Sequence, residues 1–138
     1  VKVGMDVEAA FDTGYFRRTP DDVCGQALAF KKKWLRRGLG SYVHADGVQS
    51  ISADDRSIRT TRGARVGTTL KVLRTKYPKL KGPRRVMWID GPAWWAHVRR
   101  GDRYLTFFMD SSSKPKPRSK VLYMAVSRGG PGGFGMGC

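Results

Sequence analysis

The sequence predicts an α+β protein built from two tandem units, each a short helix followed by antiparallel strands, with the helices on one face of the sheet. Two observations predict this class. A turn-and-helix motif occurs twice, at Val3 and 63 residues later at Val66, and strand-like segments follow each copy. The 138 residues, 40% of them hydrophobic, suffice for one ordinary domain. We expect a single domain over residues 1–138, with repeats at about 1–62 and 63–128 and a Gly-rich C-terminal arm at 129–138.

The repeated motif joins a tight turn to the start of a helix. It reads "VGMD" at Val3–Asp6 and "VGTT" at Val66–Thr69. The glycine permits a sharp turn from strand to helix, and Asp6 and Thr69 are both residue types that favour the N-cap of a helix. One such match is common by chance. Two in register, each followed by strand-like segments, indicate an internal duplication.

Each motif leads into a short apolar stripe. The stripe consists of Val7, Ala10 and Phe11 in the first copy and of Leu70, Leu73 and Tyr77 in the second. Spacings of three, four and seven residues place such side chains on one face of a helix, which we expect to pack against a core. Gly14 and Pro78 are expected to end the two helices.

Strand-like segments follow each predicted helix. In the first unit, "ALAFKKKWL" and "SYVHADGVQSIS" surround turns at Arg37-Gly38 and Asp46-Gly47, and the second of these turns is a strong hairpin signal. In the second unit, strands are predicted at 84–89, 94–99, 104–110 and 121–127. The stretch "SSSKPKPRSK" between the last two strands is polar and contains prolines, so we expect a loop there.

Charge is the dominant bulk property of the chain. There are 27 Lys and Arg against 11 Asp and Glu, a formal net charge of +16. This balance favours an anionic partner: nucleic acid, an acidic cell-wall polymer, anionic lipid head groups or an acidic protein. The basic residues are spread along the chain, the Lys31-Lys32-Lys33 run included, whereas a dedicated nucleic-acid reader more often concentrates them on one element. A role in solubility alone is the alternative. No apolar run approaches the roughly 18 residues of a membrane span.

The chain contains two cysteines, Cys24 and Cys138, and the second follows the Gly-rich arm. The simplest interpretation is an internal disulfide that ties the arm to the first unit. Such a bridge would stabilise the fold by roughly 4–5 kcal/mol in the chain-entropy model and would indicate an oxidising compartment. An intermolecular bridge and two free thiols are the alternatives. Two cysteines and two distant histidines do not form a metal site.

No constellation of residues in the chain is typical of catalysis. A hydrolase needs an activated nucleophile beside a base, and the histidines, His44 and His97, lie in predicted strands, where a structural or surface role is the common one. The carboxylate pairs Asp21-Asp22 and Asp54-Asp55 fit a helix start and a turn better than a glycosidase site. We therefore predict a protein that is not an enzyme and that uses no cofactor or metal.

Aromatic and arginine residues gather in the second unit, at Trp94, Trp95, Arg99, Arg100, Arg103 and Tyr104. Because successive residues of a strand point to opposite faces, Trp94 and Trp95 must face opposite ways, as must Phe107 and Phe108. One of each pair then lies on the sheet face away from the helix, unless a second layer covers it. Such a surface has the composition of a binding hot spot or of a stacking platform for single-stranded nucleic acid or sugar. A core between two sheets is the alternative.

The turn into a short capped helix, followed by a strand meander, resembles the tandem-repeat fold of the beta-lactamase inhibitory protein family and of small SmpA-like lipoprotein domains. Val3–Asp6 and Val66–Thr69, with their helices, carry this resemblance. The stretch Ser57–Pro78, "SIRTTRGARVGTTLKVLRTKYP", also looks like secreted or lipid-anchored proteins of high-GC Gram-positive bacteria. The resemblance implies the tandem fold, an extracellular address and a non-enzymatic role. It carries over no target.

These observations together predict a secreted or cell-surface binding protein, an inhibitor or modulator of an extracellular enzyme. It would present the aromatic and arginine-rich sheet face to an acidic extracellular protein. The sequence opens at Val1, inside what looks like a structured motif, and we interpret it as a mature form from which any export signal has been removed. The alternative function is electrostatic binding of an anionic polymer, nucleic acid or cell-wall polyphosphate, through Lys31, Lys32, Lys33 and the "SSSKPKPRSK" loop.

Overall fold

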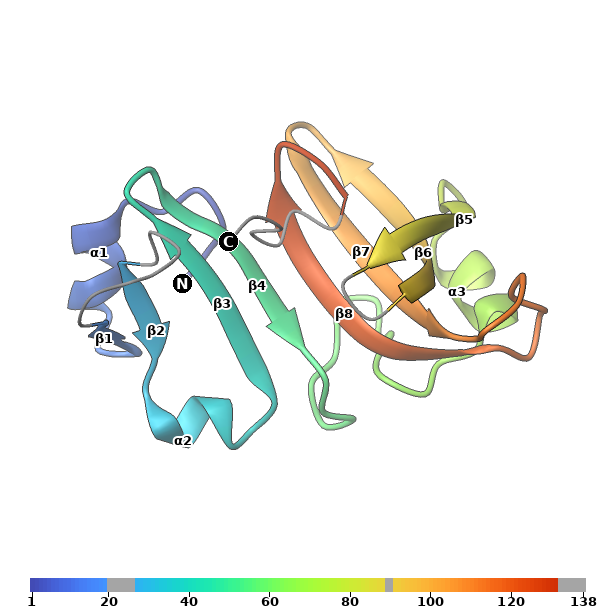
Figure 1. Cartoon of the computed structure of the whole chain (residues 1–138), viewed down its shortest axis with the longest axis horizontal. Coiled ribbons are helices and arrows are strands. Elements are labelled where there is room, and N and C mark those ends of the chain that lie inside the picture. The colour runs from blue at the N-terminus through green and yellow to red at the C-terminus, as the bar shows by residue number, and fades with distance from the viewer. Residues whose placement is uncertain (20–26, 89–90, 132–138) are drawn as a thin grey trace.

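Figure 1 shows the computed structural model of the chain, which describes residues 1–19, 27–88 and 91–131. The helices in these ranges are α1 (Val7–Asp12), α2 (Lys32–Leu35) and α3 (Leu70–Lys76). The strands are β1 (Phe16–Arg18), β2 (Leu28–Phe30), β3 (Leu39–His44), β4 (Gly47–Ala53), β5 (Lys81–Trp88), β6 (Gly91–Arg100), β7 (Arg103–Asp110) and β8 (Lys120–Arg128). The α+β class predicted from the sequence is confirmed, with sheet predominating.

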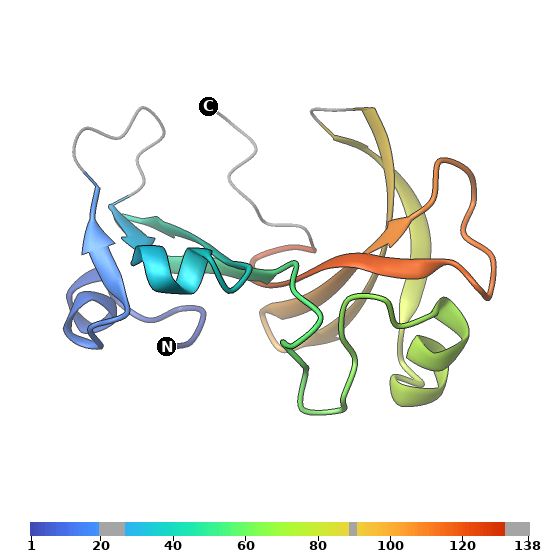
Figure 2. The same ribbon diagram turned by 90° about the horizontal axis from the view of Figure 1, so that it is seen from below.

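The strands form a six-stranded antiparallel sheet, in the order β3-β4-β8-β7-β6-β5, and a two-stranded sheet of β1 and β2. The two sheets adjoin, because the backbone amide of Ala27, next to β2, donates a hydrogen bond to the carbonyl of Val43 on β3 (2.7 Å). β4 and β8 lie side by side in the middle of the molecule (Figure 1). The six-stranded sheet is strongly curved: in Figure 2 the β5–β6 hairpin stands nearly upright where β8 runs across the view.

Most of the predicted strands are confirmed. The hairpin signal at Asp46-Gly47 corresponds to the turn between β3 and β4, which pair in antiparallel register. The four strands predicted in the second unit correspond to β5, β6, β7 and β8, each with slightly longer bounds. The "SSSKPKPRSK" stretch connects β7 to β8, and all of it except its last residue, Lys120, lies outside the strands, as its prolines predict.

The segment "ALAFKKKWL" differs from its predicted strand, because it divides into β2 and the short helix α2. Lys31 is extended and precedes the helix, and the two lysines and the leucine of α2 are good helix formers. Trp34 faces inward on this turn and contacts the ring of Tyr15, with 5.1 Å between ring centroids. Gly38, with a φ of 70°, follows the helix and redirects the chain into β3.

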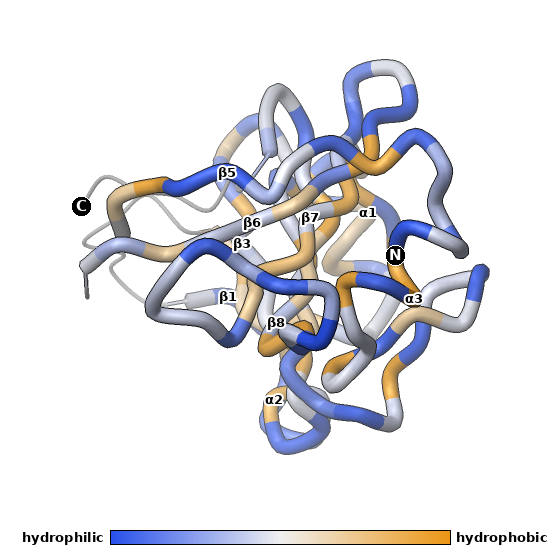
Figure 3. Tube along the Cα trace, turned by 90° about the vertical axis from the view of Figure 1, so that its right-hand side faces the viewer, coloured by the Kyte–Doolittle hydropathy of each residue, from blue (hydrophilic) through white to orange (hydrophobic). Residues whose placement is uncertain are grey.

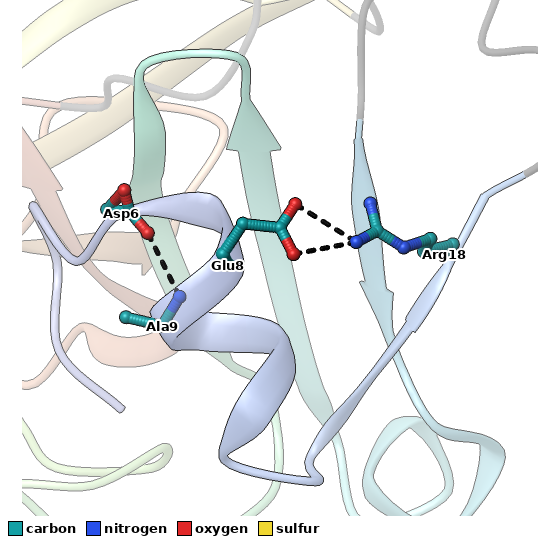
Figure 4. A network of polar contacts seen from close by, with 4 residues as sticks. All are labelled: Asp6, Glu8, Ala9 and Arg18. Carbon is teal, nitrogen blue, oxygen red and sulfur yellow. Dashed lines mark hydrogen bonds and ion pairs between the residues drawn. The ribbon is translucent and has the colours of Figure 1, made fainter.

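Both copies of the repeated motif cap their helices as the sequence predicts. Asp6 is the N-cap of α1, and its side chain accepts a hydrogen bond from the amide of Ala9 at 2.9 Å (Figure 4). Thr69 is the N-cap of α3, and its hydroxyl oxygen accepts one from the amide of Val72 at 3.3 Å. Each cap satisfies one of the amides that a helix start leaves without a partner.

The first motif is bound to the start of β4. Gly4 has a φ of 83°, a backbone conformation that glycine adopts with little strain. Its amide donates a hydrogen bond to the carbonyl of Val48 (2.7 Å), and the amide of Val48 donates one to the carbonyl of Met5 (2.8 Å). The turn is therefore paired in both directions with a central strand.

The second motif repeats this pairing at β8. Gly67 has a φ of 87°. Its amide donates to the carbonyl of Val121 (2.7 Å), and the amide of Val121 donates to the carbonyl of Thr68 (2.9 Å). The two motifs therefore make the same pair of backbone hydrogen bonds, one with β4 and the other with β8.

Among the described residues, two apolar clusters form the core, one beside α1 and one beside α3. The α1 cluster contains Val3, Ala10, Phe16, Leu28, Phe30, Val43 and Val48. The α3 cluster contains Ala53, Ala64, Leu70, Leu73, Tyr77, Phe107, Met109, Val121 and Met124. Leu39 packs against both clusters. Figure 3 shows hydrophobic residues concentrated along the strands, whereas the connecting loops are mostly hydrophilic.

One residue of the predicted stripes lies outside the core. Phe11 on α1 is 37% exposed, whereas Ala10 beside it is fully buried. The guanidinium of Arg18 on β1 covers the Phe11 ring at 4.7 Å and also forms an ion pair with Glu8 at 2.7 Å (Figure 4). A helix of only six residues has room for one fully buried side chain here, and Phe11 packs beneath a cation instead.

Candidate functional site

The strand register shows which of the paired aromatic residues turn away from α3. On β6, Trp94 packs against the α3 cluster, and the neighbouring Trp95 contacts Phe108 edge to face, with ring centroids 5.5 Å apart. On β7, Phe107 belongs to the α3 cluster, and Phe108 lies opposite Trp95. The predicted division of the two pairs between the sheet faces is confirmed. Trp95 and Phe108 are the members that face away from α3.

We call this side of the sheet the aromatic face, and its members are Trp95, His97, Tyr104, Phe108 and Tyr123. Ring contacts run across three strands, because Phe108 on β7 also contacts Tyr123 on β8 at 5.3 Å. The His97 and Tyr104 rings lie 5.7 Å apart. Phe108 and His97 are 8% and 7% exposed, whereas the other three are half-buried. The face therefore has a buried middle and partly exposed ends.

The side chain of His97 lies in a positively charged setting. Within the described residues its Nδ1 atom is buried and has no hydrogen-bond partner. Burial lowers the pKa of His97, and the positive charges of Arg84 and Lys81 lower it further. In the register Lys81 lies opposite His97, and Arg84 lies opposite Trp95. Both basic residues are exposed, so the β5 side of the aromatic face has a cationic border.

Tyr123 marks the opposite end of the aromatic face. Burial raises the pKa of its phenol, and a side-chain hydrogen bond with Ser52 on β4 acts in the other direction. That hydrogen bond ties the aromatic row to the central strands. Tyr123 is thus held at its hydroxyl while its ring contacts Phe108.

The three arginines of the β6–β7 hairpin divide between the two faces of the sheet. Arg99 lies opposite Tyr104 in the register, and its guanidinium covers the Tyr104 ring at 5.6 Å. Arg100 and Arg103 pair with each other at the end of the hairpin. Strand alternation places both on the side of Val98, which packs against the α3 cluster. The predicted grouping of all three arginines with Tyr104 on one face is therefore corrected.

Arg100 and Arg103 line a groove of about 890 Å³ between the end of α3 and the β6–β7 hairpin. Apolar side chains among its lining are Val98, Leu105, Val126, Tyr77 and Pro78. Its basic residues are Arg62, Lys79, Arg99, Arg100 and Arg103. Asp102 is the carboxylate among the described lining residues, and Arg128 Nε donates a hydrogen bond to it at 2.8 Å. The groove is therefore strongly positive.

The lysine run lies away from both of these surfaces. Lys31, Lys32 and Lys33 are all exposed and stand at the start of α2, which lies against β2 and β3 in the other half of the molecule (Figure 1). The ammonium of Lys33 lies 5.2 Å from the centre of the Trp34 ring. The structure does not bring this run together with the aromatic face.

Sequence reasoning missed four residues of these surfaces. Phe108 and Tyr123 complete the aromatic row, and strand alternation from Trp95 would have found them if the register had been known. Arg62 and Lys79 complete the groove, but they come from the segments before and after α3. No sequence spacing relates these two residues to the hairpin, so only the fold brings them to it.

Several predictions fall on residues outside the described ranges. These are the Cys24–Cys138 disulfide, the helix start at Asp21-Asp22 and most of the Gly-rich arm. Within the described ranges, no three His, Cys, Asp or Glu side chains are grouped so that they could hold a metal ion. None of the helices described is both long enough and apolar enough to cross a membrane.

Comparison of the chain with protein-family models, with curated proteins and with solved structures gives no match.

Proposed function

We propose that this chain is a non-enzymatic binding protein that docks on an acidic protein through its aromatic face. One observation carries the proposal: the contiguous row of Trp95, Phe108 and Tyr123 across three strands, on the side away from α3. Tyrosine and tryptophan dominate binding hot spots because they bury a large area while losing few rotamers. Here the ring contacts hold the row in place, so little conformational entropy is lost on docking.

The charges around the row indicate the nature of the partner. Lys81, Arg84 and Arg99 border the aromatic face. Burial lowers the pKa of His97, and the positive charges of Arg84 and Lys81 lower it further. Charge complementarity steers association and excludes partners of like charge. An acidic protein surface fits this border. We propose an extracellular enzyme as the partner and occlusion of its surface as the mechanism.

The scaffold that we propose is a single domain of two tandem units, with α1 and α3 on one face of the sheet. Ile51 packs against the α1 cluster and Ala53 belongs to the α3 cluster, and residues two apart on a strand share a face. On β8, likewise, Val126 packs against the α1 cluster and Met124, two residues away, belongs to the α3 cluster. In Figure 2 both helices lie below β3, β4 and β8. This arrangement would suit the tandem-repeat inhibitor fold that the sequence resembles, together with its secreted or cell-surface address.

Affinity capture with matched variants tests the proposed function. Wild-type protein, Trp95→Ala and Met87→Ala are immobilised, and secreted and surface material of the source is passed over each and eluted in salt steps. Met87 is the control because it is 69% exposed and lies on a strand of the same sheet, but strand alternation places it on the other face. Arg84→Glu provides a second test that leaves the aromatic packing in place.

The expected result is one acidic protein that survives high salt on the wild-type and Met87→Ala columns. Its affinity should fall at least about tenfold for Trp95→Ala, as for a central aromatic hot spot, and its rate of association should fall for Arg84→Glu. Thermal melting of each variant shows whether it is folded. A protein retained equally by all four columns, or none retained by any, contradicts the proposal.

The unpaired charge of the chain favours a second candidate function, binding of an anionic polymer. All Lys and Arg residues lie in the described ranges, and with the carboxylates described there only Arg18 and Arg128 form ion pairs. A polyanion would replace the missing counter-charges and release its own counterions. Titration of an oligonucleotide and of polyphosphate against salt tests this function. A steep fall of affinity with salt and indifference to polymer sequence support it, whereas a shallow slope contradicts it.

A further inference from the structure

The groove lies on the α3 side of the sheet, away from the aromatic row. It has two walls and an apolar floor. One wall is formed by Arg62, which precedes α3 in the chain, and by Lys79, which follows it. The other wall is formed by the β6–β7 hairpin. The floor lies between the two apolar clusters, because Val98 and Leu105 pack against the α3 cluster and Val126 packs against the α1 cluster. The groove therefore follows the junction between the α1 cluster and the α3 cluster.

One arginine of the groove is already held in place. Arg62 Nη1 donates a hydrogen bond to the carbonyl of Lys76 (2.8 Å), and its guanidinium lies 5.5 Å from the centre of the Tyr77 ring. A guanidinium has five donor N–H groups, so Arg62 keeps further donors for an incoming anion. Holding this side chain in advance lowers the entropy lost when a ligand binds.

Arg100 and Arg103 supply the charge that has no counter-ion at this site. Both are exposed, and neither forms an ion pair or a side-chain hydrogen bond with the described residues. The Asp102 carboxylate between them is already bound by Arg128 at 2.8 Å. Arginine presents a planar fork that matches a carboxylate or phosphate in a bidentate contact. The rim of the groove is therefore suited to several anionic groups along one chain.

The floor distinguishes between the two polymers that carry such groups. Nucleic-acid bases stack on exposed aromatic faces, but Tyr77 is only 7% exposed, and Arg62 covers its ring. The Tyr104 ring contacts His97 on the aromatic face. Val98, Leu105, Val126 and Pro78 are aliphatic, and they fit the aliphatic side chains of a peptide. The floor and the rim together match a peptide in which acidic and aliphatic residues alternate.

We propose that this groove binds an extended acidic peptide segment that carries aliphatic side chains, with its carboxylates on Arg62, Arg100 and Arg103 and its aliphatic groups on the apolar floor. The proposal goes beyond docking through the aromatic face, and it holds whether or not that face binds a protein. Where both surfaces act on one partner, the segment would be a second contact reached around the β6–β7 hairpin.

Fluorescence anisotropy with three probes tests the proposal on the whole chain. The probes are a labelled peptide of alternating Glu and Leu, the same peptide with Ser in place of Leu, and a labelled single-stranded oligonucleotide. The test variant is R100E/R103E. The control is K114E/K116E in the β7–β8 loop, which changes the net charge equally at two exposed residues away from the groove. Circular dichroism of both variants shows that they are folded.

The expected result is binding of the Glu-Leu peptide that falls about a hundredfold for R100E/R103E, since two charge-assisted contacts become repulsive, and about twofold at most for K114E/K116E. The Ser peptide should bind at least about tenfold more weakly than the Leu peptide, because it buries no aliphatic groups. Trp95→Ala should bind the peptide as the wild type does. Equal losses in the two double variants, equal binding of the Leu and Ser peptides, or tighter binding of the oligonucleotide would overturn the proposal.

Discussion

The two halves of the molecule share a backbone device and differ in what they build on it. Each half begins with a Gly turn at positive φ that exchanges two hydrogen bonds with a central strand and leads into a capped helix. In the first half the helix buries only Ala10, and the core is completed by the stacked rings of Phe16 and Phe30, 4.5 Å apart. In the second half, Leu70 and Leu73 are both buried from the helix.

The difference shows that the turn and cap are independent of the surface that each half exposes. The strands of the second half are longer, and they carry the aromatic face and the positive groove on opposite sides. The first half has two short strands, β1 and β2, and a small helix, α2, in their place. The repeated part of the sequence therefore specifies the scaffold, and the unrepeated strands of the second half specify the candidate binding surfaces.

The largest expected effect on stability is at Leu73, the core position of α3 that corresponds to the much smaller Ala10 of α1. Leu73 and Ala10 occupy equivalent places in the two helices, and both are fully buried. Leu73→Ala should lower the free energy of unfolding by about 2–5 kcal/mol, because the surrounding cluster cannot close over the lost side chain. Urea denaturation measures this change. A loss below about 1 kcal/mol would mean that α3 is not part of a packed core.

The two glycines of the repeated turn should respond alike to substitution. Gly4→Ala and Gly67→Ala place a Cβ at φ values of +83° and +87°, and no atom lies closer than 3.7 Å to either Cβ. The cost is therefore conformational, about 1–2 kcal/mol for each variant. Thermal or urea unfolding of both variants checks this. Costs that differ by more than about 1 kcal/mol would show that the two turns are not equivalent.

The aromatic face should make the stability of the protein depend on pH. The pKa of His97 is lowered by burial and by Arg84 and Lys81, so the folded state favours the neutral imidazole. The stabilisation is present above the unfolded pKa of about 6.5 and is lost as the pH falls through the folded pKa. Unfolding measured between about pH 7 and about pH 5 should show this loss in the wild type and a smaller one in His97→Gln. If the free energy of unfolding depended on pH in the same way for the wild type and for His97→Gln, His97 would not be the group responsible for the loss.

The smallest effect is expected at the exposed ion pair of the first half. Glu8 and Arg18 are 66% and 56% exposed at their side chains and are 2.7 Å apart. Glu8→Gln should cost less than about 1 kcal/mol, because surface ion pairs are screened by water. Denaturation at low and high salt measures it, and the small difference should vanish at high salt. A larger cost that persists in salt would indicate that the pair positions β1 against α1.

Local signals explain which parts of the structure the sequence predicts well. The N-caps at Asp6 and Thr69 and the Asp46-Gly47 hairpin depend on a few neighbouring residues, and all three are confirmed. The helix α2 was missed because its four residues are too few to show a helical period beside the strand that precedes them.

The surfaces depend on pairings that are distant in sequence. The choice between Trp94 and Trp95 requires the register of β6, because a shift of one residue exchanges the two faces. The groove joins Arg62 and Lys79 to the β6–β7 hairpin, which begins at Gly91, and no local pattern relates them. The sequence predicts the residue types of the binding surfaces, and the fold decides which of them meet.

Side-chain oxidation of the captured complex tests the central claim, that the aromatic face is the docking surface. Hydroxyl-radical labelling reads individual side chains, so it separates the two faces of one strand. We predict that Trp95 and Tyr123 lose most of their labelling when the partner is bound, whereas Met87, which is 69% exposed on β5, keeps its own. Equal labelling of Trp95 and Tyr123 in the free and bound protein would contradict the claim.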